Sequence, residues 1–93
     1  MDRVETIRKQ LSEALEASYI DIIDESHLHA GHPGAAAGGG HFNVTIVSGQ
    51  FDGQATLARH RMVYAAVDNL MPAEIHALSI KALTPDEHAS AEA

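Results

Sequence analysis

The sequence predicts a small α+β domain in which helices cover one face of a three-stranded sheet. The length of 93 residues leaves room for one domain, and a content of 45% apolar but only 4% aromatic residues is enough for a modest aliphatic core. Two longer segments carry apolar residues at helical spacing, and three shorter segments are β-branched or alternate apolar with polar residues as strands do. The order of these segments along the chain implies one helix-on-sheet layer.

The N-terminal part is predicted to form a helix and then a strand. Apolar residues recur at helical spacing over residues 2–17, and Asp2 followed by Glu5 is a capping-box pattern at the start. Residues 19–24, YIDIID, are short and β-branched, which is typical of a strand. Residues 26–40 are rich in glycine, so we expect a mobile loop that joins the first strand to the second.

The C-terminal part is predicted to add two strands and two helices. Residues 41–48 alternate apolar and polar side chains and are expected to pair antiparallel with the first strand. A second helix is expected over residues 56–70, ended or restarted by Pro72, and a third strand over residues 76–84. The sequence Thr84-Pro85-Asp86-Glu87 then combines an N-cap, a first-turn proline and a capping-box glutamate, and starts a short last helix. In the second helix, four residues are expected to share one core-facing stripe: Leu57, Tyr64, Val67 and Met71.

Composition narrows the possible functions. Thirteen acidic against six basic residues give a net charge of −7, which disfavours a protein that binds by neutralising many phosphates. The chain has no cysteine, so it cannot hold an iron–sulfur cluster by its own thiolates, and any metal must be bound by His, Asp or Glu. No segment approaches the roughly 20 apolar residues of a membrane span. We therefore expect a soluble, cytoplasmic domain over residues 1–88 with a frayed tail over residues 89–93.

Particular residues indicate a family. The run HFNVTIVSGQFDGQATLARHRMVYAAV at residues 41–67, followed by IHALSIKALTPDE at residues 75–87, resembles the BolA family. The resemblance extends back through DES at residues 24–26 and the pairs His29-Ala30 and Pro33-Gly34, so it covers nearly the whole chain. It implies a class II KH-like fold with a three-stranded mixed sheet, in the order helix, strand, strand, helix, short helix, strand, helix.

The resemblance also implies an adaptor function rather than an enzyme. Family members pair with monothiol glutaredoxins and share a bridging [2Fe-2S] cluster with the glutaredoxin and glutathione, in cluster trafficking or iron regulation. On this basis we expect a chain that is a monomer when alone, forms a heterodimer with a glutaredoxin and holds no cluster when isolated. The sequence also lacks a serine elbow and a phosphate-binding glycine loop, which agrees with a protein that is not an enzyme.

Histidines are the ligands that the resemblance implies for the cluster. His76 matches the family's C-terminal ligand histidine, and His29 matches the loop position where relatives carry His or Cys. Imidazole is a suitable iron ligand and raises the cluster potential relative to thiolates. The alternatives are a capping histidine at a strand end for His76 and a solvated loop histidine for His29. His27 and His32 flank His29 and can replace it, and His41, interpreted as structural, is a further alternate ligand.

A basic cluster is the candidate surface for an acidic partner or a nucleic acid. It consists of Arg59, His60 and Arg61 on the second helix with Lys81 on the third strand, and its alternative is an ordinary solvated helix face. A class II KH fold binds nucleic acid through a GxxG loop between two helices. Residues 68–74, taken as that helix connection, contain no glycine, and the GxxG letters at residues 31–34 lie between strands.

Two other hypotheses are carried forward. The first is a DNA-binding transcriptional regulator that uses a KH-like surface, with at best weak DNA binding because of the acidic net charge. The second is a site for zinc or another divalent ion in the histidine-rich loop.

Overall fold

The computed structural model describes residues 3–25, 40–71 and 75–92, and their elements follow the predicted α+β order. The helices and strands are α1 (Arg3–Leu15), β1 (Tyr19–Asp24), β2 (Gly40–Val47), η2 (Gly49–Phe51), α3 (Thr56–Ala66), η3 (Asp68–Leu70), β3 (Ile75–Leu83) and α4 (Pro85–Glu92). The two η elements are 3₁₀ turns. The predicted fold class is confirmed.

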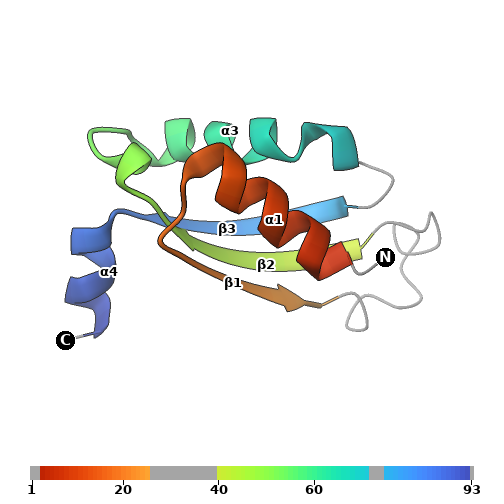
Figure 1. The fold of residues 1–93 in the computed structure, drawn as a ribbon, viewed down its shortest axis with the longest axis horizontal. Helices are drawn as coiled ribbons and strands as arrows, with labels where there is room; N and C mark the ends of the chain where they lie inside the picture. The colour runs from red at the N-terminus through yellow and green to blue at the C-terminus, as the bar shows by residue number, and fades with distance from the viewer. Residues whose placement is uncertain (1–2, 26–39, 72–74, 93) are drawn as a thin grey trace.

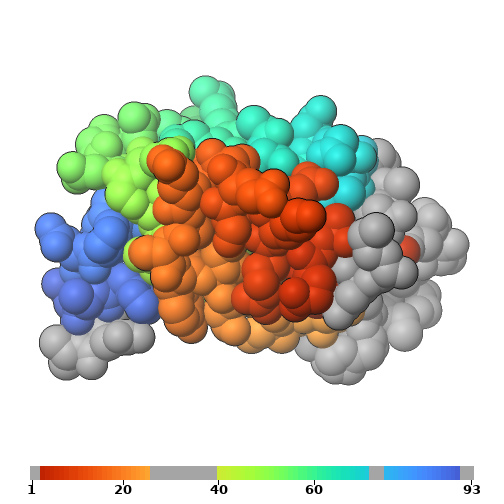
Figure 2. Space-filling view, viewed as in Figure 1, coloured from red at the N-terminus to blue at the C-terminus, as the bar shows by residue number. Residues whose placement is uncertain are grey.

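The three strands form a mixed sheet in the order β1-β2-β3. β1 pairs antiparallel with β2, and β3 pairs parallel with β2, which requires a crossover between them. The segment from η2 through η3 makes this crossover, and it places α3 on the same face of the sheet as α1 (Figure 1). In the space-filling view, α1 lies in front and α3 borders it (Figure 2), and the ribbon shows α4 beyond the C-terminal end of β3 (Figure 1).

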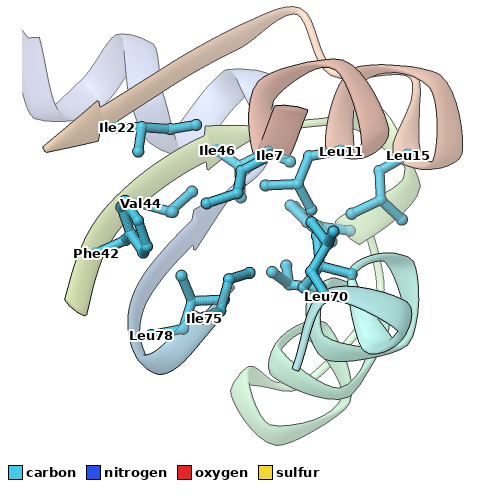
Figure 3. Packing of buried hydrophobic residues seen from close by; sticks show 13 residues of the cluster. Ile7, Leu11, Leu15, Ile22, Phe42, Val44, Ile46, Leu70, Ile75 and Leu78 are labelled. Atoms are coloured by element: carbon cyan, nitrogen blue, oxygen red, sulfur yellow. The ribbon is translucent and has the colours of Figure 1, made fainter. Parts of the chain in front are cut away.

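The core lies between the two helices and the sheet (Figure 3). Alternate residues of the central strand β2 point toward the helices, and these residues are Phe42, Val44 and Ile46. From the helix side, α1 contributes Ile7, Leu11 and Leu15, as its helical spacing predicts. Full burial of each of these apolar side chains stabilises the fold by about 1.5–3 kcal/mol.

The predicted stripe of the second helix is wrong at two of its four positions. Leu57 and Tyr64 are 63% and 39% exposed, whereas Val67 is buried and Met71 packs against the core. Leu57 and Tyr64 are seven residues apart and share one face of α3, and the buried face is rotated away from it because it runs through the neighbouring residue Val63. The core face is instead formed by Val63, Val67 and Leu70.

Other boundaries also differ from the sequence prediction. The turn η2 was not predicted; it is capped by the buried Ser48, whose hydroxyl accepts a hydrogen bond from the Gln50 backbone and donates one to the Leu15 carbonyl at 2.5 Å. This bond ties the end of α1 to the end of β2. At the C-terminus, α4 extends through Glu92, into the residues predicted as the tail. None of the helices in the described ranges is long and apolar enough to cross a membrane.

Candidate functional site

The structure brings two of the predicted histidines together at one end of the sheet. His41 is the second residue of β2 and His76 is the second residue of β3, and these strands run parallel side by side. Their ring centroids lie 5.2 Å apart with an angle of 47° between the ring planes. The sequence analysis named both residues but did not predict that they are neighbours.

A bulge in β3 determines where His76 points. Gly40 is in register with Ile75 and His41 with Ala77, so His76 is an extra residue without a register partner on β2. In a regular strand His76 would share the face of Leu78 and point into the core. Because of the bulge, Ile75 occupies the core position that His76 would otherwise take, and His76 is exposed.

His41 is held more firmly than His76. It lies on the central strand, its carbonyl oxygen accepts a hydrogen bond from the Glu25 backbone at 2.8 Å, and the small residue Ala77 is opposite it on β3. The Nε2 atom of His41 is buried, whereas the His76 side chain is exposed. The two imidazoles therefore differ in access to a partner, although their rings are in contact.

The three loop histidines, His27, His29 and His32, lie outside the described residues. The described residues on either side of them, Glu25 and Gly40, lie at the same end of the sheet as the histidine pair, since Glu25 is bonded to His41 and Gly40 precedes it. Within residues 3–25, 40–71 and 75–92, no group of three or more His, Asp or Glu side chains could hold a metal ion. The described part of the chain thus provides an exposed imidazole, but not a complete metal site.

In the basic cluster, the Arg59 side chain forms hydrogen bonds within the molecule. Its guanidinium donates to the Glu87 carboxylate, to the Ala82 carbonyl at 3.0 Å and to the Gln54 carbonyl at 2.8 Å, and the side chain is only 13% exposed. The hydrogen bond from Arg59 is the main reason why the pKa of Glu87 is lowered to about 2, and the bond from the Thr84 backbone adds to it. The same pair raises the pKa of Arg59. Arg59 therefore joins the start of α3 to the start of α4.

The rest of the basic cluster is more accessible. Arg61 and Lys81 are exposed and His60 is half-buried. The sequence identified Glu87 as a capping-box residue but carried no signal for its contact with Arg59. Its carboxylate accepts from the Thr84 backbone at 2.8 Å as predicted, and the same carboxylate also binds Arg59.

The helix connections of the crossover contain no GxxG sequence. The structure has one connection at residues 52–55, between η2 and α3, and a second at Val67, between α3 and η3. The connection at residues 52–55 was not recognised as a helix connection because η2 was not predicted. The single glycine of this connection, Gly53, adopts a left-handed φ of 77°. Neither connection in this part of the chain offers the glycine-rich backbone that a KH domain uses to approach phosphates.

Comparison with known proteins agrees with this fold and with the sequence resemblance. The family model described as BolA-like protein matches residues 11–87. The chain belongs to the BolA family. Human BolA-like protein 1 is 42% identical over 79 residues, a match that covers 85% of this chain and 56% of the human protein, so the chain spans little more than half the length of that relative.

Solved structures of BolA-family proteins share the whole described architecture. BolA1 from Arabidopsis thaliana is 37% identical with a TM-score of 0.78, and the match covers 94% of this chain and 96% of that one. The BolA domain of SufE1 from Arabidopsis thaliana is also 37% identical, with a TM-score of 0.81 and the same coverage. The three-stranded mixed sheet and its helices are therefore the BolA fold.

Proposed function

We propose that this chain is an adaptor that binds a monothiol glutaredoxin and supplies histidine ligands to a [2Fe-2S] cluster shared with that partner, in cluster trafficking or iron regulation. Family membership supports an adaptor function of this kind, and one structural observation supports it for this chain in particular. The bulge in β3 turns His76 out of the core at the end of the sheet where residues 26–39 begin and end.

The donor set fits such a cluster. With no cysteine, the chain offers neutral imidazole nitrogens, which bind iron well but leave the thiolate ligands to the glutaredoxin and glutathione. His76 is the ligand in the described part of the chain, and His29 is the first choice for the second, with His27 and His32 as replacements. When bound, the cluster would supply redox-active iron, and ligation by histidine would raise the reduction potential of the cluster relative to ligation by thiolates alone.

The isolated chain should hold no cluster, because it provides no thiolate. The chain would therefore bind the cluster only together with a partner, as an adaptor does, and not as a protein with a resident cofactor. Recovery of a stable iron–sulfur chromophore on the purified monomer would contradict the proposal.

The decisive experiment is a titration of the chain into a reconstituted glutaredoxin–glutathione cluster. We expect a heterodimer by size-exclusion chromatography together with altered visible absorption and circular dichroism. His76→Ala should lose the spectral change, and His88→Ala, which removes a histidine from the opposite end of the sheet, is the matched control. A wild-type chain that leaves both the spectrum and the elution volume unchanged would refute the proposed function.

The alternative of a DNA-binding regulator has less support. Arg59 is bound to Glu87, the crossover connections lack GxxG, and the net charge is −7. We expect only non-specific DNA affinity, with a dissociation constant on the order of 10⁻⁴ M or weaker at physiological salt. Sequence-selective binding at sub-micromolar concentration in an anisotropy titration would favour this alternative over the adaptor.

A further inference from the structure

We infer that His41 is a positioning residue for His76: its ring holds the His76 imidazole in the orientation that a ligand requires, and His41 does not itself bind the cluster. The inference rests on the proposed function, because it concerns the same site. It assigns separate roles to two histidines that sequence patterns treat as possible ligands of the same kind.

The first argument is the contact between the rings. A centroid separation of 5.2 Å with an interplanar angle of 47° falls within the range of attractive aromatic contacts, about 4.5–7 Å. The contact follows from the backbone. The bulge turns His76 to the side of the sheet on which His41 lies, and the methyl group of Ala77, in register with His41, leaves space for the His76 ring.

The second argument is the difference in restraint between the two residues. His41 lies on the central strand, between β1 and β3, and its carbonyl is bonded to Glu25. His76 occupies the bulge of an edge strand and its side chain is exposed. A restrained ring that packs against an exposed one limits the rotamers of the exposed side chain before the partner arrives.

The third argument is accessibility. His41 is half-buried and its Nε2 atom is buried, so iron delivered by a partner protein cannot reach that nitrogen without movement of the ring. The His76 side chain is exposed and meets no such barrier. Ligands of metal sites are commonly oriented by neighbouring groups that do not touch the metal, and ring packing by His41 would serve this purpose here.

Two substitutions separate positioning from ligation. His41→Phe keeps an aromatic ring but has no nitrogen, and His41→Ala removes both. His88→Ala is the control, because it removes a histidine from a ring contact at the opposite end of the sheet. Circular dichroism and urea unfolding of each variant establish that the fold is retained, and His41→Leu provides a second variant without a ring in case His41→Ala does not fold.

The first measurement uses the free chain, so its outcome does not depend on a glutaredoxin. Three-bond couplings at Cβ of His76, measured by NMR, report whether the side chain occupies one χ1 rotamer. We expect one rotamer in the wild type and in His41→Phe, and averaged couplings in His41→Ala. Equal averaging in the wild type, or a single rotamer retained in His41→Ala, would overturn the positioning role.

The second measurement uses the mixed complex with glutaredoxin, glutathione and the cluster. We expect His41→Ala to weaken the complex about 2- to 10-fold, which corresponds to the ordering cost of one side chain, while the nitrogen couplings in pulsed EPR remain. His41→Phe should match the wild type in both. Loss of a nitrogen coupling in His41→Phe would show instead that His41 is a ligand. If neither the wild type nor any variant forms the complex, the proposed function is wrong. The rotamer measurement on the free chain would still show whether His41 orients His76.

Discussion

The two ends of the sheet each place a histidine ring beside another ring, in different surroundings. Where β3 passes into α4, the ring centroids of His88 and Tyr19 lie 4.8 Å apart. There the Glu87 carboxylate accepts hydrogen bonds from Arg59 and from the Thr84 backbone, and the Thr84 hydroxyl accepts one from the Glu87 backbone. At the opposite end, His41 and His76 lie 5.2 Å apart beside a bulge, and His76 is exposed. One end contains the Arg59–Glu87 ion pair, and the other presents an exposed imidazole.

This difference indicates how a small domain separates stability from binding. Hydrogen bonds that satisfy both partners stabilise the fold, and such groups are not available to a ligand. An exposed imidazole on a bulge contributes little to the core and can be changed with little effect on folding. Substitutions at the α4 end should therefore change stability, and substitutions at the His76 end should change binding.

The largest effect is expected from His76→Ala. In the mixed complex this change should abolish the nitrogen couplings of His76, because no other described imidazole is exposed at this end of the sheet. The free energy of unfolding should remain within about 0.5 kcal/mol of the wild type, since the side chain lies outside the core. Pulsed EPR of the reduced complex and urea unfolding of the free chain measure the two quantities.

Two outcomes of that experiment would contradict the assignment of binding to the His76 end of the sheet. Unchanged nitrogen couplings would mean that the ligand is another histidine, and a loss of more than about 2 kcal/mol in stability would mean that His76 is structural after all.

At the other end, Thr84→Ala should lower the free energy of unfolding by about 1 kcal/mol. The Thr84 hydroxyl accepts a hydrogen bond from the Glu87 backbone at 3.2 Å, and loss of an N-cap side chain typically costs this amount. Thr84→Ser keeps the hydroxyl and is the matched control. The spectra of the mixed complex should be the same for both variants, and a change confined to Thr84→Ala would show that the two ends are coupled.

The sequence predicted elements that depend on nearby residues. The spacing of Ile7 and Leu11 gave the core face of α1, and the pattern from Thr84 to Glu87 gave the capped start of α4. These features depend on residues within one or two turns, so a single chain reveals them.

The antiparallel pairing of β1 with β2 was predicted and is confirmed, but other features that depend on contacts between distant segments were not predicted. The bulge at His76 is a matter of register between β3 and β2, and the Arg59–Glu87 pair joins residues 28 positions apart. Arg59 was predicted to lie on a partner surface because no local pattern in the sequence indicates that it binds Glu87. The identity of the second ligand among His27, His29 and His32 stays a prediction, because these residues lie outside the described ranges.

A smaller effect is expected from pH. The pKa of Glu87 lies at about 2 in the folded chain and near 4.5 without its partners, so the stabilisation from this carboxylate is fully present above about pH 4.5 and is lost as the pH falls toward 2. Urea unfolding between pH 7 and pH 2 should show this loss in the wild type and a smaller loss in Glu87→Gln. Asp86→Asn removes an equal charge next to the pair but leaves the pair intact, so it should keep the wild-type loss. An identical pH profile for Glu87→Gln and the wild type would show that the pair with Arg59 adds nothing to stability in solution.

The smallest effect is expected from the ring contact at the α4 end. His88→Ala removes the contact with Tyr19 and should lower the free energy of unfolding by about 0.5 kcal/mol, the low end for aromatic pairs, because Tyr19 is 44% exposed. The nitrogen couplings and the affinity for glutaredoxin should not change, whereas His41→Ala should weaken the complex. If His88→Ala instead weakened the complex and left stability unchanged, the α4 end would be part of the partner surface. Two histidine contacts of similar geometry would then serve the same partner, and the division between a stabilising end and a binding end would not hold.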